Sequence, residues 1–286
     1  MFAADECKIC GSKALERRAH TARCQVCGVL LYYPYPTDQH NGSDANAHRE
    51  QWHDHSAHLN HDNFTRMLRF AIDPTLFGAR QSVRVLDYGG GGGQFAMVCK
   101  SLLPRSEVFF VDIADDGLLD VYRPCQKQIL WREFRSDQTT FDYIFLNDVY
   151  EHLSDPVGTL ALLKTRLSPH GKIFIDTPKQ FWLYPLSKAA IPGLHLKLLR
   201  GTVSQAHVQI WSRKAFDVSC ERVGLTRTRY KEIAEFTRAP SYYLRNMGIT
   251  NPVLTAVANA FYGGAKWFAS NKILAVLEPN QKRGQS

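Results

Sequence analysis

The chain has 286 residues, of which 44% are hydrophobic, as expected for a globular protein with one large domain and an appendage or with two small domains. It has no apolar run of about 18 residues and no charged, apolar leader, so we expect neither a membrane-spanning helix nor export, and we expect a cytoplasmic protein. The formal net charge of +8 favours acidic partners such as nucleic acid, nucleotide sugars, phosphorylated metabolites or anionic lipid surfaces, although a solvated basic surface would give the same value.

Four of the seven cysteines form two C-x-x-C pairs near the N-terminus, each followed by a glycine that suits a tight turn. Two such pairs can surround one Zn²⁺ tetrahedrally, and four thiolates leave no coordination position open. Disulfides are the alternative, but cytoplasmic thiols stay reduced. We therefore predict a structural zinc site formed by Cys7, Cys10, Cys24 and Cys27.

We divide the chain into a zinc-binding module over residues 1–37, a polar connector with helices over residues 38–80, and a larger domain over residues 81–286. The connector is rich in histidine. We interpret it as an exposed polar segment; transition-metal binding is the alternative, but no clustered carboxylates complete such a site. Its histidines are His40, His48, His53, His55, His58 and His61.

An apolar strand over residues 83–88 contains Asp87 and runs into five consecutive glycines. Such a turn lets a nucleotide-like cofactor lie against bare backbone where a strand leads into a helix. The glycine spacing is G-x-G-x-G, without the third glycine of a dinucleotide fingerprint. With an acid two residues before the first glycine, this region resembles class I S-adenosylmethionine (SAM) methyltransferases. The resemblance implies that Gly89, Gly91 and Gly93 approach the methionine and ribose of SAM, and that Asp87 orders the loop or contacts the amino group.

The resemblance also implies an α/β fold, a Rossmann-like seven-stranded sheet whose seventh strand is antiparallel and lies between strands five and six, together with the small N-terminal zinc ribbon. We predict a helix over residues 94–100 and a second strand over residues 107–112. Strands four to seven follow over residues 141–147, 171–177, 225–233 and 272–277.

The acid that ends the second strand, Asp112, lies about 20 residues past the glycine loop, where a carboxylate can accept both ribose hydroxyls. Its neighbour Ile113 could flank the adenine. The alternative role for Asp112 is that of a helix N-cap.

The run F-D-x-I-x-L-N-D-V-x-E-H-L-x-D-P after residue 140 resembles the motif that follows strand four in small-molecule methyltransferases. The resemblance implies that Asn147 and Asp148 line the pocket. Glu151 and His152 could transfer protons, but neighbouring helical residues point about 100° apart, so we expect only one of them to face the site. His152 is a catalytic candidate, and a structural or gating role is the alternative.

His207 begins an H-x-x-x-aromatic-S run that resembles a motif before the last sheet helix of the same family. It is the leading candidate for a general base, and fixing a lid by a hydrogen bond is its alternative role. Two insertions, over residues 178–206 and 240–270, are rich in aromatic residues. For the first we favour a substrate lid over a membrane-surface helix, and the second could complete the pocket or form a dimer contact.

The cysteine knuckle, the apolar strand after it and the P-x-P-T run ending at Thr37 resemble the zinc segment of bacterial methyltransferases that commonly methylate sugars and other small metabolites. We therefore predict a SAM-dependent methyltransferase with structural Zn²⁺ that acts on a small acidic metabolite, a sugar or a nucleotide-linked compound. An rRNA or tRNA methyltransferase is one alternative, disfavoured because no basic stripe with interleaved aromatics and no N-P-P-Y or D-P-P-Y tetrad occurs. The other is a non-catalytic zinc-ribbon protein with a relic SAM fold. The sequence does not fix the acceptor atom or the oligomeric state.

Overall fold

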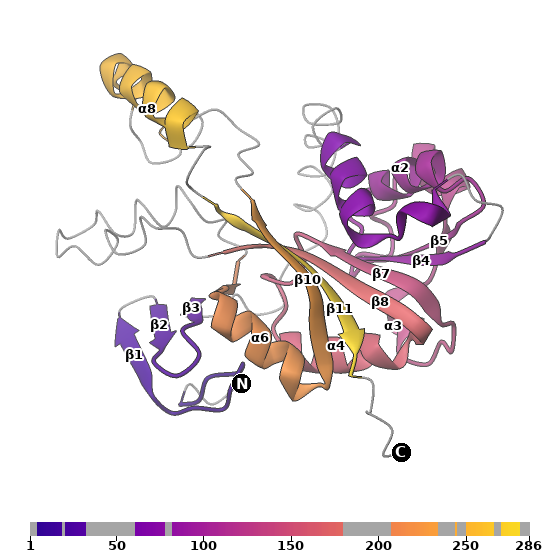
Figure 1. The fold of residues 1–286 in the computed structure, drawn as a ribbon, viewed down its shortest axis with the longest axis horizontal. Helices are drawn as coiled ribbons and strands as arrows, with labels where there is room; N and C mark the ends of the chain where they lie inside the picture. Colours follow the sequence, from indigo (N-terminus) through magenta and orange to yellow (C-terminus); the bar gives the residue numbers. More distant parts are fainter. Residues whose placement is uncertain are drawn as a thin grey trace. The chain divides into compact units, whose positions relative to one another are not determined.

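The computed structural model describes residues 5–18, 21–32, 61–77, 82–179, 207–233, 244, 250–265 and 270–280 (Figure 1). The chain forms two compact units, which we describe separately. The first comprises Met1–Pro36, Pro178–Phe216 and Lys231–Ile273. The second comprises Thr37–Thr177, Asp217–Tyr230 and Leu274–Ser286.

A seven-stranded sheet forms the framework of the fold (Figure 1). In spatial order its strands are β10 (Leu225–Ile233), β11 (Lys272–Pro279), β8 (Leu167–Pro178), β7 (Phe141–Asn147), β4 (Arg84–Tyr88), β5 (Glu107–Val111) and β6 (Lys127–Gln128).

The strands from β6 to β8 are parallel. Strand β11 is antiparallel to β10, because Asn280 donates its backbone N–H to Gly224 at one end and Asn271 donates to Ile233 at the other. The predicted Rossmann-like sheet, with its last strand antiparallel between strands five and six, is confirmed.

Phenylalanine rings cover one face of the sheet in a continuous row. The ring of Phe95, from α2 (Gln94–Leu102), lies 4.8 Å from that of Phe145 in β7, which in turn lies 5.2 Å from Phe174 in β8. A helix over residues 61–71 adds Phe64, 5.5 Å from Phe95, and Phe70, 6.2 Å from Phe174. These contacts bury the apolar side of a helix that lies in the predicted polar connector.

The remaining helices of this framework are short. They are α3 (Trp131–Phe134), α4 (Pro156–Thr165) and α6 (Arg213–Arg222), with 3-10 turns η1 (Pro74–Leu76) and η2 (Asp120–Cys125). Helix α4 ends at Thr165 and β8 begins at Leu167, so the strand that we predicted over residues 171–177 begins earlier than expected. Gly171 permits this early strand, because a Cβ there would lie 2.6 Å from the carbonyl oxygen of Phe141.

A second, four-stranded sheet lies in the first unit. It contains β1 (Leu15–Arg18), β2 (Thr21–Cys24), β3 (Leu30–Tyr32) and β9 (Gln209–Ile210), in that order. Adjacent strands pair antiparallel, and β9 joins through Leu30 opposite Ile210 and Leu31 opposite Gln209. The N-terminal segment therefore forms a sheet with a strand that is far away in the sequence.

The two predicted insertions are described in part. Beyond Lys179, the first insertion, to residue 206, lies outside the described residues. In the second, the chain forms α8 (Pro252–Ala265). No helix among the described residues is long and apolar enough to cross a membrane.

Candidate active site and metal centre

The carboxyl ends of the central strands carry most of the predicted cofactor residues, all in the second unit. Strand β4 pairs with β5 on one side and β7 on the other, so that the order of the strands reverses at this point. In open α/β sheets, ligands bind at such a reversal, outside the carboxyl ends of the strands. The glycine loop follows β4, Asp112 follows β5, and Asn147 ends β7. Topology therefore brings these three predicted elements to one edge of the sheet.

The glycine loop needs glycine for two different reasons. Gly91 has φ +57°, a left-handed angle that side chains disfavour, and a Cβ there would meet nothing within 4 Å. Gly90 has no such angle, but its Cβ would lie 2.4 Å from Asp87 Oδ2 and 2.7 Å from Phe110. The loop is thus packed against the strands at Gly90 and open at Gly91, as the approach of a cofactor to the backbone requires. We did not predict a role for Gly90.

The Asp112 carboxylate is 7% exposed and connects the second strand to the glycine loop. Its Oδ2 accepts a hydrogen bond from the Gly91 N–H at 2.9 Å, and its Oδ1 accepts one from the Ala114 N–H at 3.0 Å. The second bond closes a local turn, and since residues 112–119 are not helical, Asp112 is not the helix N-cap that we considered as the alternative. The first places the carboxylate beside the open part of the loop. Ile113, next to it, is 62% exposed and available to a flat apolar group.

Asp87 is buried beneath the loop, and its surroundings disfavour its charge. Burial, and then the negative charge of Asp112, raise the pKa of this carboxyl from 3.8 to about 8, while the amide of Asn147 acts in the opposite direction. Asp87 is therefore mostly a neutral acid at pH 7. A cation that bound beside it would favour the carboxylate and release the proton.

The chain is unusual where β7 ends. Both polar atoms of the Asn147 amide are buried without a hydrogen bond of normal geometry within the described part of the chain. The next residue, Asp148, has φ +52° and is the one non-glycine residue with positive φ among those described. Backbone strain of this kind is concentrated at functional sites. The Asn147 amide and the strained turn at Asp148 are features typical of a functional site, and they favour the end of β7 as part of one.

The Glu151–His152 pair has one buried and one accessible member. Glu151 is fully buried, and its Oε2 accepts a hydrogen bond from Thr177 Oγ1 at 2.9 Å. His152 Nε2 lies 3.8 Å from Glu151 Oε1, and the imidazole is 32% exposed. The buried carboxylate lies close enough to the imidazole to influence its orientation, while the imidazole itself remains partly accessible.

The other catalytic candidate, His207, is half-buried and lies in the first unit, two residues before β9. The same motif contains a residue that we did not single out. Ser212 Oγ donates a hydrogen bond to the Cys27 carbonyl at 2.8 Å and accepts one from the Ala215 N–H at 3.1 Å. A serine three residues before an amide at a helix start is a recognisable N-cap, but its bond to Cys27 has no signal in the sequence.

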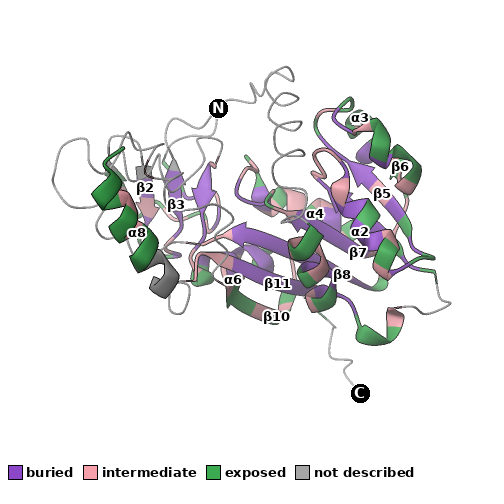
Figure 2. Ribbon diagram, turned by 90° about the horizontal axis from the view of Figure 1, so that it is seen from above, coloured by how far each residue is buried: buried purple, intermediate pink, exposed green. Residues whose placement is uncertain are grey.

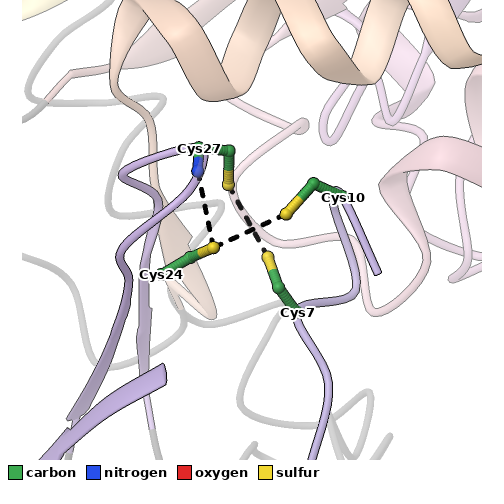
Figure 3. A group of neighbouring side chains, drawn as sticks. All are labelled: Cys7, Cys10, Cys24 and Cys27. Carbon is green, nitrogen blue, oxygen red and sulfur yellow. Dashed lines mark hydrogen bonds between the residues drawn. The ribbon is translucent and has the colours of Figure 1, made fainter. Parts of the chain in front are cut away.

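The four predicted zinc ligands lie together in the first unit (Figure 3). The sulfurs of Cys7 and Cys27 are 3.7 Å apart, and those of Cys10 and Cys24 are 3.5 Å apart. Four sulfurs at about 2.3 Å from a tetrahedral zinc would be separated by about 3.8 Å, so the cluster fits this ion. The Cys27 N–H donates a hydrogen bond to Cys24 Sγ at 3.5 Å.

Backbone turns hold both cysteine pairs. The Gly11 N–H donates to the Cys7 carbonyl at 2.7 Å, and the Gly28 N–H donates to the Cys24 carbonyl at 2.9 Å. Both glycines have left-handed φ angles, +74° and +78°. The glycine after each pair thus closes the turn, as the sequence predicted.

Sheet order, glycine loop and strand-end acids together define the SAM-dependent methyltransferase class. A family model described as "Methyltransferase domain" matches residues 48–229, which is more than half of the chain. The protein belongs to this family and is a SAM-dependent methyltransferase. Comparison with curated proteins gives no match.

Solved structures share the fold at low sequence identity. A protein from Bacillus halodurans C-125 described as a methyltransferase is 12% identical with a TM-score of 0.54, over 77% of this chain and 100% of that one. The YcgJ protein from Bacillus subtilis is 14% identical with a TM-score of 0.51, over 78% and 99%. Mitomycin 7-O-methyltransferase MmcR is 11% identical with a TM-score of 0.52, over 84% and 58%. These likenesses concern the fold.

Proposed function

We propose that the protein methylates a small acidic metabolite, such as a sugar acid or a nucleotide-linked sugar, and that it works in the cytoplasm with a structural zinc ion bound by its four N-terminal cysteines. The observation that carries this proposal is the charge of the segment that follows β8. From Pro178 to Phe216 the sequence has no Asp or Glu but has six basic residues. These are Lys179, Lys188, Lys197, Arg200, Arg213 and Lys214. The chain that leaves the cofactor edge of the sheet is therefore suited to an anionic substrate.

When bound, SAM supplies an electrophilic methyl group on a sulfonium. The protein then mainly has to hold the donor and acceptor in line and exclude water, and orientation of this kind is worth roughly 7–11 kcal/mol. We assign Asp112 to the ribose hydroxyls, Gly89, Gly91 and Gly93 to the backbone surface of the loop, and Asp87 to the amino group.

Asn147 and Asp148 would line the acceptor side of the cofactor, and Ile113 the adenine. A hydroxyl acceptor must lose a proton, and we assign that step to His207 or His152. In His152 the buried Glu151 carboxylate would stabilise the imidazolium that forms.

Titration with S-adenosylhomocysteine by calorimetry tests the cofactor site. We expect one-to-one binding that Asp112→Ala weakens at least tenfold, whereas Asp116→Ala, on the exposed surface of the same region, leaves it unchanged. Unchanged affinity in the Asp112→Ala variant would contradict the assignment. Binding should also tighten as the pH rises to about 8, by up to tenfold per pH unit, because the ligand's ammonium favours ionised Asp87.

Transfer of a labelled methyl group from SAM tests the substrate class. We expect incorporation into acidic sugars or sugar nucleotides, with a dependence on salt that is weaker than nucleic-acid binding would give. Incorporation into RNA that falls steeply with added salt would contradict the proposal and favour the nucleic-acid alternative, because phosphate contacts release counterions.

A further inference from the structure

We propose that α8 binds the surface of an anionic lipid bilayer. This inference concerns a helix that contains none of the proposed cofactor residues, and it does not depend on the substrate proposed above.

The start of α8 is determined by its own sequence rather than by packing. Asn251 Oδ1 accepts hydrogen bonds from the N–H groups of Val253, at 2.9 Å, and Leu254, at 3.2 Å. Pro252 occupies the first helical position, where its fixed φ is favourable and its missing N–H is not needed. The capping side chain and the proline favour the helix even when its sides face water.

The apolar side of α8 faces outward. Val253 is 68% exposed, Leu254 is 52% exposed and Val257 is 60% exposed. Val253 and Val257 are four residues apart and share one face of the helix, with Leu254 beside them. Figure 2 shows α8 exposed along most of its described length. A helix of a soluble protein normally turns branched aliphatic residues toward the core, whereas on α8 these three side chains are exposed within the part of the chain that the structure describes.

Charge identifies the partner. The sequence has no Asp or Glu from Phe236 to Leu277, and α8 itself carries no charged residue. Four basic residues flank it, namely Arg238, Arg245, Lys266 and Lys272. An apolar helix within a basic stretch of sequence complements a bilayer with anionic headgroups. A second copy of the chain fits less well, because association would bring together two regions of like charge.

The length of α8 agrees with a helix that lies flat. Its 14 residues extend about 21 Å at about 1.5 Å per residue, less than the roughly 30 Å of a bilayer core. The polar side chains Thr255 and Asn259 are four residues apart, on the side of the helix away from Val257. The helix can therefore bury its aliphatic face at the headgroup boundary and keep the exposed Asn259 in water, with the half-buried Thr255 also on the side away from the bilayer.

Co-sedimentation of the zinc-loaded protein with vesicles tests the proposal, without SAM. We expect binding to phosphatidylcholine vesicles that contain about 30% phosphatidylserine and at least tenfold weaker binding to phosphatidylcholine alone. A double variant with Val253→Gln and Val257→Gln should lose at least tenfold in partition, because glutamine keeps the helix but removes the aliphatic face. Asn259→Gln, on the polar side of the same helix, should bind as the wild type does.

Sedimentation velocity and far-UV circular dichroism complete the test. Circular dichroism checks that each variant keeps its helix content. Absence of binding to anionic vesicles by the folded wild-type protein would overturn the proposal, as would unchanged binding by the double variant. A concentration-dependent dimer that the double variant abolishes, with no vesicle binding, would show that a second copy covers this face instead.

Discussion

Replacing the buried acid under the glycine loop should change how the stability of the protein depends on pH. The pKa of Asp87 is 3.8 outside the fold and about 8 within it, mainly because of burial and then because of the charge of Asp112. The folded chain thus holds a proton that the unfolded chain has released. The stability that neutral Asp87 confers is complete below about pH 3.8 and is lost as the pH rises through about 8. Since one pKa unit corresponds to about 1.4 kcal/mol, ionising this group in the fold costs on the order of 5 kcal/mol.

The variant Asp87→Asn cannot lose a proton at this position. The free energy of unfolding of the wild type, relative to this variant, should therefore fall by about 1.4 kcal/mol per pH unit between about pH 5 and about pH 7. Urea denaturation of both proteins at several pH values in this window measures the difference, in which the titration of all other groups cancels. Asp116→Asn, which removes an exposed carboxylate, controls for the loss of one charge. A difference that stays constant with pH would refute the reasoning.

Three further changes test the loop and the metal centre. Gly90→Ala should abolish S-adenosylhomocysteine binding in calorimetry, because its Cβ would lie 2.4 Å from Asp87 Oδ2. The control Gly92→Ala, whose Cβ would have its nearest neighbour at 3.3 Å, should still bind the ligand. Equal affinities of the two variants would contradict the steric argument. Ser212→Ala should lower the free energy of unfolding by about 1–3 kcal/mol in chemical denaturation, because it removes a helix cap and a bond to the Cys27 carbonyl. Removal of zinc by a chelator should speed amide hydrogen exchange at β9, because β9 pairs with β3 of the segment that carries the cysteines. Unchanged exchange after verified metal loss would show that β9 is held independently of the metal.

The sequence predicts the sheet well where strands are long. Residues 141–147 and 225–233 form β7 and β10 with the predicted bounds. Strands β6 and β9 have two residues each, too few for any periodicity, and exist because β5 and β3 offer them a free edge. Pairing with a distant partner is a property of the fold, so a local pattern cannot reveal it.

The same distinction applies to the candidate site. Residues that we propose to contact the cofactor, such as Asp112 and Gly91, can be recognised in the sequence by their type and spacing. Residues that act through distant neighbours are not. Gly90 is required by the position of Phe110 in the next strand, and Ser212 bonds a carbonyl 185 residues away in the chain. Burial likewise sets the pKa of Asp87, which sequence alone shows only as an acid near glycines.

Strand β9 connects the cysteine cluster to a part of the chain that is far away in the sequence. Free energy from zinc binding is folding free energy where the site forms only in the folded chain. Here the folded site includes β9, through Leu31 opposite Gln209 and through the bond from Ser212 to Cys27. His207 lies just before that strand, so metal binding would also stabilise the chain that carries it. If His207 is the base that we propose, zinc at a site with no open coordination position would in this way affect proton transfer by holding His207, without touching the substrate.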